Sequence, residues 1–347
     1  MRPGHPARPF LRKRASAASR LLVLATGLYA ACALAVPAVL GRLGDHWWPT
    51  TVFMFGPRWV VALPLVLLLL AALFLRPRLL PWLLALGALV GVLVLGFNLP
   101  WRRLAAPAPA APAFRLLTWN VGGGGQERAL ASPAFLASAR GVDVVVLQEC
   151  RPSDREGLPG WHTHFDAGQC LMSRLPLART DDRPRGDMWK LGGSGAIVSY
   201  EIEAPGGRFS LTNVHLETPR EGLDALRYQG ALGSGELERK NAQRRLEARL
   251  AREWVDTGPP LPRIVAGDFN MTCDSAVFRE AWGDLTDAFS AAGFGFGHTK
   301  TTRFIGVRID HVLVDRSWRV QSAEVEPKDP GHDHQALVVE LARISAE

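Results

Sequence analysis

The chain of 347 residues lacks the residue spacings that commonly bind zinc. It has four cysteines without any CxxC pair and no HxxxH spacing, so no zinc site is predicted. Cys32 lies in an apolar run, whereas Cys150, Cys170 and Cys273 lie in the more polar part of the chain. Two of these three could pair in an oxidising compartment, and the sequence does not decide which. We expect them to act mainly as small buried apolar residues.

Charged residues are absent from three long runs near the N-terminus, 21–41, 59–75 and 79–101. Runs of about twenty apolar residues match a bilayer core of about 30 Å, so three transmembrane helices are predicted. The middle run is short and should cross with little tilt. A secretory signal peptide is the alternative for the first run, because arginines precede it; the run is longer than a usual signal, however, and two more runs follow.

Lys and Arg are unevenly distributed around these runs, which predicts an orientation. Residues 1–20 are rich in Arg, whereas the loop 42–58 has only its two bounding cations. Because cationic segments stay on the cytoplasmic side, we expect a cytoplasmic N-terminus and an extracytoplasmic domain after three crossings. Arg102 and Arg103 count weakly against this topology. A transport role has little support, because no charged residue interrupts any run.

The net charge of +7 does not indicate a nucleic-acid binder, because most of the excess lies near the membrane segments. Residues 1–103 hold twelve Lys or Arg and one acidic residue, which leaves 28 basic and 32 acidic residues in the remainder. A non-specific DNA binder usually presents a basic surface. One predicted helix has such a row, but a solvated helix face is favoured for it; its cations are Arg239, Lys240, Arg244, Arg245, Arg249 and Arg252.

A segment rich in Pro and Ala, 102–113, predicts an extended spacer before a domain that spans 114–347. Residues 236–256 have the apolar periodicity of an amphipathic helix. Short apolar runs elsewhere in the domain predict strands and an α/β fold with a substantial core. These runs are 114–119, 142–148, 168–173, 194–202, 208–215, 262–267, 309–314, 319–326 and 335–341.

Polar side chains follow several of the predicted strands. Glu149 ends the run 142–148 and is well placed to hold a hard divalent cation such as Mg²⁺, which accepts one or two carboxylates and shares oxygens with a phosphate. A surface glutamate that merely follows a strand is the alternative. Asp268 and Asn270 follow another strand after Gly267, where one can orient water and the other can donate to a phosphoryl oxygen. A tight turn would use the same residue types.

Two histidines are candidates for acid catalysis. Asn213 and His215 face the same way on one strand, and a protonated His215 could supply a proton to a leaving alkoxide. His334 is expected to pair with Asp310, because a carboxylate on one ring nitrogen frees the other for phosphate. A structural histidine in a strand is the alternative for His215. The remaining imidazoles leave a local metal cluster open as a rival interpretation; they are His298, His311 and His332.

The order of these motifs from residue 114 to the end resembles the endonuclease/exonuclease/phosphatase superfamily. The motifs are Trp119-Asn120, Gln148-Glu149, Ser173-Arg174, Asn213-Val214-His215-Leu216, Gly267-Asp268-Phe269-Asn270, Ile309-Asp310 and Asp333-His334. The resemblance implies a four-layer α/β sandwich, with two packed, mostly antiparallel β-sheets flanked by helices. It also implies a phosphodiesterase or phosphatase site that uses Mg²⁺ or Mn²⁺.

The same resemblance implies a role for each site residue. Asn120 and Glu149 would lie at the metal with Asp333 in support, and Asp268 would orient or deprotonate the attacking water. Phosphate would be held by the amides of Asn213 and Asn270. The transition state or leaving oxygen would be stabilised by His215 and His334, with Asp310 orienting the latter.

Two departures from the family pattern bear on the substrate. Gly122 stands where the apurinic-endonuclease branch often has an acidic ligand, which makes repair of abasic DNA an unlikely function. His332 replaces the usual Ser before the final Asp-His pair, which could alter the metal or the pH optimum.

We therefore expect a membrane-anchored phosphoester hydrolase that acts on a phospholipid head group, a nucleic acid or a small phosphodiester, with the bilayer as its partner and no protein partner. A catalytically idle phosphate-binding module on a membrane anchor is the alternative.

Overall fold

The computed structural model describes residues 8–101, 113–122, 133–151, 158–166, 168–182, 185–329 and 331–344. The chain divides into two compact units: Met1–Arg42 with Pro57–Phe97, and Leu43–Gly56 with Asn98–Glu347. All but the last residue of the predicted spacer 102–113 lies outside the described residues, as do residues 1–7 of the basic N-terminal segment.

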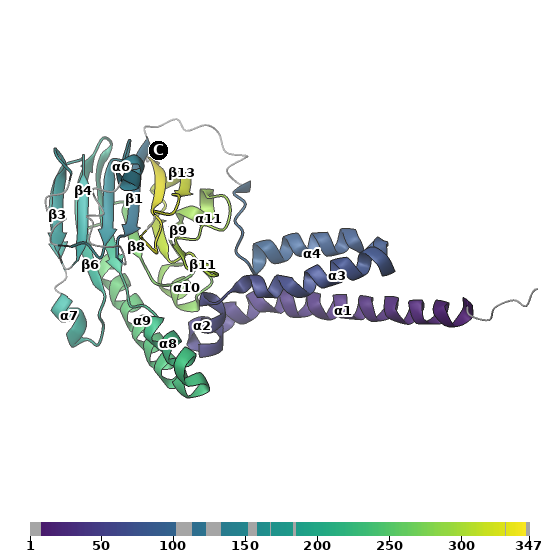
Figure 1. The fold of residues 1–347 in the computed structure, drawn as a ribbon. Helices are drawn as coiled ribbons and strands as arrows, with labels where there is room; N and C mark the ends of the chain where they lie inside the picture. The colour runs from purple at the N-terminus through teal and green to yellow at the C-terminus, as the bar shows by residue number, and fades with distance from the viewer. Residues whose placement is uncertain are drawn as a thin grey trace, which may run out of the picture. The chain divides into compact units, whose positions relative to one another are not determined.

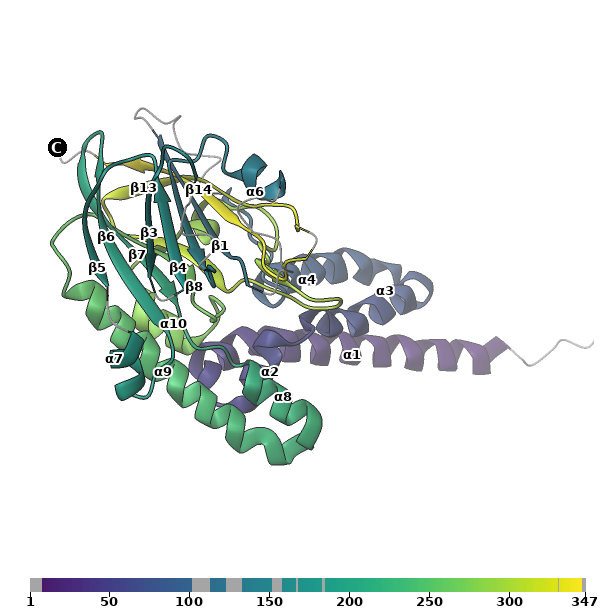
Figure 2. The same ribbon diagram turned by 60° about the vertical axis from the view of Figure 1, so that its left-hand side comes forward.

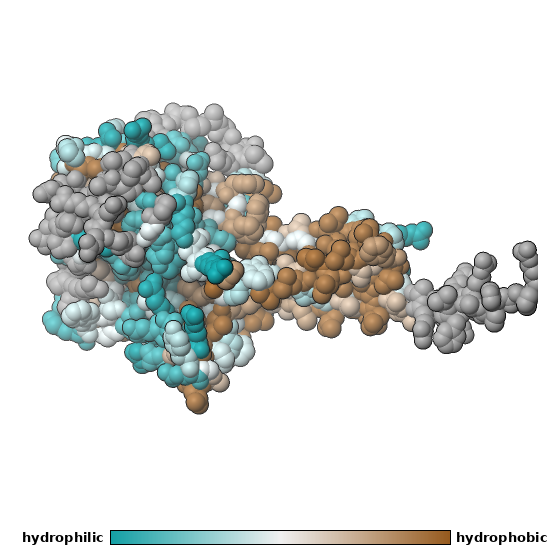
Figure 3. Space-filling model, in the orientation of Figure 1, coloured by the Kyte–Doolittle hydropathy of each residue, from teal (hydrophilic) through white to brown (hydrophobic). Residues whose placement is uncertain are grey.

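The first unit consists of apolar helices: α1 (Arg8–Arg42), η2 (Arg58–Ala62), α3 (Leu63–Leu75), η3 (Pro77–Leu79) and α4 (Leu80–Leu93). A small internal cluster includes Leu22, Leu65 and Leu83, while many other apolar side chains of these helices are exposed (Figure 3). By length and composition, the segments Ala17–Arg42 and Arg58–Leu75 could each cross a membrane, although a signal sequence passes the same test. The third apolar helix, Pro77–Leu93, is shorter than the predicted span 79–101.

The second unit contains two six-stranded mixed sheets (Figures 1 and 2). The first has the order β13 (Trp318–Val325), β14 (Leu337–Arg343), β1 (Ala113–Asn120), β2 (Val144–Gln148), β4 (Gln169–Ser173) and β3 (His162–Asp166). The second has the order β5 (Leu177–Asp182), β6 (Ala196–Ala204), β7 (Gly207–His215), β8 (Arg263–Asp268), β12 (Asp310–Val314) and β9 (Thr286–Asp287). Each sheet has one parallel pair, β1 with β2 and β7 with β8, and its other pairs are antiparallel.

The main hydrophobic core lies between the two sheets, where side chains such as Leu116, Val146, Leu211 and Val312 are fully buried. Central strands such as β2 and β12 are buried along their whole length, which explains their continuous Val and Leu content. The core is closed at one side by α11 (Ala288–Ala292), and a two-stranded ribbon, β10 (Lys300–Thr301) with β11 (Gly306–Val307), lies outside both sheets.

Helices cover the outer faces of both sheets. A second apolar cluster packs α6 (Pro133–Ser138) on the first sheet, and a third packs α9 (Ser234–Asp256) and α10 (Ala276–Trp282) on the second. The unit has three further helices: α7 (Arg185–Lys190), α8 (Arg220–Gln229) and the 3₁₀ helix η6 (Gly230–Gly233). The layers helix, sheet, sheet, helix confirm the predicted α/β sandwich. The unit also includes η1 (Gly44–His46) and α2 (Trp48–Phe55) from the loop between the first two apolar helices.

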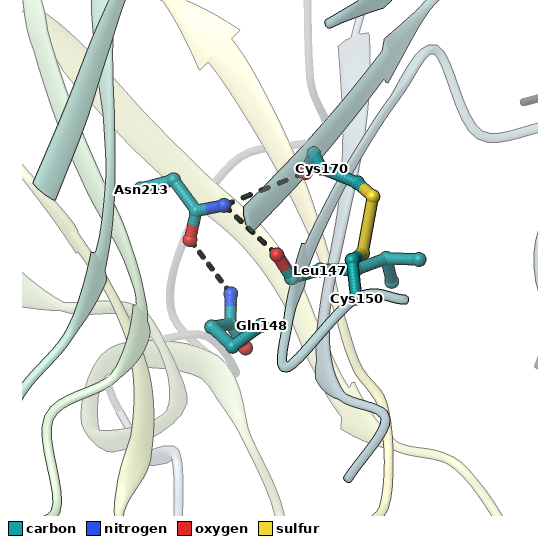
Figure 4. The surroundings of a disulfide bond; sticks show 5 residues. All are labelled: Leu147, Gln148, Cys150, Cys170 and Asn213. Atoms are coloured by element: carbon teal, nitrogen blue, oxygen red, sulfur yellow. Dashed lines mark hydrogen bonds between the residues drawn. A yellow bond between two sulfur atoms is a disulfide. The ribbon is translucent and has the colours of Figure 1, made fainter. Parts of the chain in front are cut away.

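Cys150, which directly follows Glu149, forms a disulfide with Cys170 of strand β4 (Figure 4). The expectation that the cysteines act mainly as small buried apolar residues is therefore wrong for Cys150 and Cys170, and the alternative that two of the three pair is confirmed. The antiparallel pairing of β2 with β4 brings the two close together. Cys273 is free, and its sulfur lies 3.1 Å from the Arg308 guanidinium.

Candidate active site

Three of the predicted site residues form one row across the second sheet. His215 ends β7, Asp268 ends β8 and Asp310 begins β12, and the strand register pairs Asp268 with both of the others. Residues in one row of a sheet project from the same face, so the three side chains lie together. The distance from His215 Nε2 to Asp268 Oδ2 is 3.9 Å.

The first sheet adds Asn120, which ends β1, and Glu149, which follows β2. The Asn120 amide donates to Glu149 Oε1 at 3.0 Å and to Asp268 Oδ2 at 2.9 Å, so it bridges the two sheets. Glu149 Oε1 also lies 3.8 Å from His215 Nε2. The ends of strands from both sheets therefore meet at one place.

The backbone is strained at this place. Within the described residues, Glu149 and Asn270 are the non-glycine residues with positive φ, at 57° and 51°. Such conformations cost free energy and cluster at functional sites. A side chain at Gly122 would meet the Glu149 carboxylate, because an added Cβ would lie 1.9 Å from Oε2. The position where the apurinic-endonuclease branch often has an acidic residue is thus adjacent to Glu149.

Asp268 is buried and held by two donors, the Asn270 backbone N–H at 2.8 Å from Oδ1 and the Asn120 amide on Oδ2. Burial, with a further contribution from the Asp310 carboxylate, raises the pKa of Asp268 above its usual range. A carboxylate with a raised pKa is a better proton acceptor.

His334 lies just before β14 and is buried against Asp310. Its Nδ1 is 2.9 Å from Asp310 Oδ2, so the carboxylate accepts the Nδ1 proton and Nε2 faces Asp268 Oδ2 at 3.7 Å. Burial opposes the charged ring, but Asp310 and Asp268 outweigh it and raise the pKa of His334. The indole of Trp119 donates to the His334 carbonyl at 3.2 Å and helps to fix its position.

Lys300 also belongs to this site, although no sequence pattern predicted it. Its Nζ lies 2.7 Å from His334 Nε2 and 2.8 Å from Asp333 Oδ2. An isolated β-bridge between Lys300 and His334 brings the lysine there from the loop that follows α11. Asp333, which we expected to support the metal, forms an ion pair with Lys300, and its role at the metal stays a prediction. Burial alone would raise the pKa of Asp333, but the hydrogen bond from Lys300 lowers it.

The donor set fits a divalent metal ion. Among the described residues, the ligand atoms of Asp268, Asp310 and His334 lie within 4.8 Å of one another. Glu149 is 48% exposed and adds a further carboxylate beside them. Carboxylate-rich groups suit hard cations. The group differs from the predicted set of Asn120, Glu149 and Asp333, because only the fold brings Asp310 next to Asp268.

The two predicted phosphate-binding amides have different surroundings. Asn213 is fully buried; its amide donates to the carbonyls of Leu147 and Cys170, and its oxygen accepts from Gln148 (Figure 4). These bonds join the two sheets beneath the site, so a contact of Asn213 with phosphate stays a prediction without geometric support. Asn270 lies in the turn after Asp268, where its amide donates to the Leu216 carbonyl.

The three spare histidines are dispersed. The His311 ring is held by Asp287 at 2.9 Å and by the Met271 carbonyl at 2.9 Å, and His332 packs 4.8 Å from the Trp119 ring. His298 stacks 5.4 Å from Phe296. None of them belongs to the candidate metal group within the described part of the chain.

Comparisons with known proteins agree with this fold. A family model described as "Endonuclease/Exonuclease/phosphatase family" matches residues 117–333. A solved structure of an endonuclease/exonuclease/phosphatase family protein from Bacteroides thetaiotaomicron has a TM-score of 0.52 at 16% identity, over 68% of this chain and 100% of that one. A humanized D. rerio TDP2 with 14 mutations has a TM-score of 0.50 at 15% identity, over 66% and 98% of the two chains. No curated protein sequence matches the chain.

A two-sheet sandwich with acidic, amide and imidazole groups at the strand ends is the architecture of phosphoester hydrolases of this superfamily. The chain belongs to the Endonuclease/Exonuclease/phosphatase family.

Proposed function

We propose that this protein is a membrane-anchored, divalent-metal-dependent phosphoester hydrolase that uses an activated water. The observation that carries the proposal is the convergence of Glu149, His215, Asp268 and His334 from four separate segments. His215 Nε2 lies 3.8 Å from Glu149 Oε1 and 3.9 Å from Asp268 Oδ2, and His334 Nε2 lies 3.7 Å from Asp268 Oδ2. A binding module would need no buried carboxylate beside two imidazoles.

In this proposal each side chain has a distinct task. Asp268 accepts a proton from the attacking water, because its raised pKa makes it a stronger base. His215 supplies a proton to the leaving oxygen. His334, oriented by Asp310 through Nδ1, presents Nε2 to a phosphoryl oxygen, and Lys300 adds a second positive charge there.

Mg²⁺ or Mn²⁺ bound at this site would supply Lewis-acid stabilisation of the charge on the phosphoryl oxygens. Glu149 is the residue that we propose as its principal ligand, because its carboxylate is half exposed and lies beside the Asn120 amide. The Asp310 carboxylate already contacts the His334 ring, and the Lys300 ammonium lies beside His334 Nε2. The part of the site around Asp310 and His334 is therefore less open to a cation.

The second compact unit supports three membrane crossings. Its residues 43–56 and 98–347 belong together, and the intervening segment 57–97 is apolar. If this segment enters the bilayer, it must cross an even number of times to return to the same side. The helix Pro77–Leu93 is about 25 Å long at ~1.5 Å per residue, close to a bilayer core of about 30 Å. It is therefore proposed as the third span, despite its short length.

The Cys150–Cys170 disulfide supports an extracytoplasmic domain, because structural disulfides persist mainly in oxidising compartments. A C-terminal alkaline phosphatase fusion should then be active, and a C-terminal fluorescent protein exported through the general secretory route should be dark. The reverse pattern would place the domain in the cytoplasm.

The activity test uses the full chain in detergent or nanodiscs. We expect Mg²⁺-dependent hydrolysis of an activated phosphodiester, loss of activity with EDTA, and a fall of at least about 10²-fold in His215→Ala and Asp268→Ala. Unchanged rates in both variants would refute the site. Parallel assays with DNA, sphingomyelin and phosphoinositides would identify the substrate class, for which an extracytoplasmic lipid head group or small phosphodiester is as well supported as DNA. Ligand binding without turnover across this panel would favour the idle binding module.

A further inference from the structure

The loop between the first two apolar helices is built into the catalytic unit. Residues 43–56 belong to the same compact unit as the two sheets, although residues 57–97 separate them in the sequence. Within this unit, η1 and α2 lie beside α9 and α10 (Figures 1 and 2). The loop contributes the one acidic residue of the first hundred, Asp45.

Asp45 forms a fully buried ion pair with Arg244 of α9. Asp45 Oδ2 lies 3.2 Å from Arg244 Nη1, and neither side chain is exposed. The Ser275 hydroxyl lies 2.7 Å from both carboxylate oxygens of Asp45, and the Val277 N–H lies 3.4 Å from Oδ1. A buried guanidinium is costly without a paired carboxylate. Asp45 is therefore the group that makes burial of Arg244 tolerable.

The same arginine reaches the turn that holds the proposed catalytic base. Arg244 Nη2 donates to the Asn270 carbonyl at 2.8 Å, and the Asn270 N–H donates to Asp268 Oδ1 at 2.8 Å. Asn270 has φ of 51°, so its peptide is held in a conformation that the chain would not adopt freely. A continuous series of polar contacts thus joins Asp45 to Asp268.

Several other contacts fix the loop in place. The Asn241 amide donates to Thr51 Oγ1 at 2.9 Å, and Trp48 N–H donates to Glu238 Oε1 at 2.9 Å. Gly44 has φ of 43° and approaches α10 so closely that an added Cβ would lie 2.5 Å from Ala276 Cβ. Only glycine meets both conditions without strain.

We propose that the loop 43–56 is an integral part of the catalytic unit and that Arg244 is a positioning residue, which transmits the Asp45 contact to the Asp268–Asn270 turn. The inference rests on the proposed function for its effect on turnover. According to this proposal the N-terminal apolar helices do not serve only to anchor the protein. The loop between the first two of them completes the domain that begins at residue 114.

The first test compares full-length variants in nanodiscs. Asp45→Asn leaves Arg244 charged and unpaired, so the melting temperature should fall by about 10 °C. Arg244→Lys keeps the charge beside Asp45 but cannot make the forked contacts of a guanidinium, so kcat should fall about tenfold while KM changes less than about twofold. Arg249→Lys, at an exposed position of the same helix, is the matched control and should resemble the wild type.

A cross-link tests the docking without reference to activity. Cysteines at Thr51 and Asn241 should be joined by mild oxidation in intact membranes, detected as a linked peptide pair by mass spectrometry of a non-reduced digest. Cysteines at Thr51 and Arg249 should not be joined. This measurement decides the docking if Asp45→Asn fails to fold.

The outcomes separate the two proposals. Absence of the Thr51–Asn241 cross-link, or wild-type melting of Asp45→Asn, would overturn the docking. Wild-type kcat in Arg244→Lys would overturn the positioning role. If the cysteine pair at Thr51 and Asn241 is joined and Asp45→Asn melts as expected, but the wild type hydrolyses no phosphoester, the proposed function is refuted and the docked loop stands.

Discussion

Two clusters of buried charge in the same unit differ in how their charges are balanced. In one, Asp287 faces Arg308 and His311; burial alone would raise the pKa of Asp287, but the Arg308 charge and the contact with His311 outweigh it and hold the pKa well below the usual range. In the other, Asp268 faces a second carboxylate, Asp310, and its pKa is raised. Both carboxylates are largely buried, with side-chain exposures of 11% for Asp287 and 1% for Asp268, so the neighbouring charge decides whether a carboxylate stabilises the fold or is poised to react.

The comparison predicts that changes in the first cluster affect stability, whereas changes in the second affect activity. The largest effect is expected for His215→Gln, which removes the proposed proton donor while nearly preserving side-chain volume. We expect kcat to fall about 10³-fold with an unchanged melting temperature. His162→Gln, at an exposed position on β3, is the control. A loss of stability equal to the loss of activity would contradict the division between the clusters.

The next effect is on stability. Asp287→Asn leaves Arg308 buried with no carboxylate opposite and should cost about 3 kcal/mol at neutral pH, with kcat unchanged. Because the folded-state pKa of Asp287 is depressed, its contribution is present above its unfolded pKa of about 3.9 and is lost as pH falls toward the folded value. The difference between variant and wild type should therefore shrink in acid.

Chemical denaturation at several pH values measures this difference. Asp284→Asn is the control, because its ion pair with Arg252 is largely exposed and should contribute less than about 1 kcal/mol. Equal losses in the two variants would show that the Asp287 cluster has no special role in stability.

The metal site yields a smaller effect. Glu149→Gln should raise the Mg²⁺ concentration for half-maximal activity by about 10- to 100-fold, and by more than Asp310→Asn does, if Glu149 is the principal ligand. Glu324→Gln, at an exposed position of β13, should leave it unchanged. The opposite ranking of Glu149→Gln and Asp310→Asn would place the cation among Asp268, Asp310 and His334.

The smallest predicted effect concerns Lys300. Lys300→Gln should raise KM about tenfold, because one charge-assisted contact with phosphate is lost, and should raise it more for a phosphomonoester than for a phosphodiester. Lys328→Gln is the control, because the exposed Lys328 Nζ donates to the Thr301 carbonyl at 3.2 Å. An unchanged KM for both substrates would show that Lys300 does not contact phosphate and serves only to position Asp333 and His334.

Much of the sandwich could be predicted from the sequence, because its central strands are buried along their length. All nine predicted strand runs correspond to strands of the two sheets, and the predicted helix 236–256 corresponds to α9. The edge strands β3 and β5 and the two-residue strands β9, β10 and β11 were missed. Half-exposed edges and very short ladders leave no apolar run or periodicity to detect.

The candidate site was predictable where it lies close to either end of a strand. Asn120, Glu149, His215 and Asp268 were found at the ends of strands, and Asp310 and His334 at or just before the start of strands. Lys300 and Arg244 were not found, because Lys300 begins the two-residue strand β10 and Arg244 belongs to a row of helix cations that was interpreted as solvated. The loop 43–56, between two apolar helices, gave no sign in the sequence that it belonged to the domain.

By itself, the sequence determined the apolar segments, the α/β class and the set of reactive groups, because hydrophobic periodicity and residue chemistry are local properties. Only the tertiary structure decided which carboxylates are neighbours, that Cys150 pairs with Cys170, that Asn213 is enclosed, and that Asp45 compensates Arg244. Those outcomes depend on strand register and on contacts between residues far apart in the chain. Burial then determines how much free energy it costs to leave one of these polar groups unpaired.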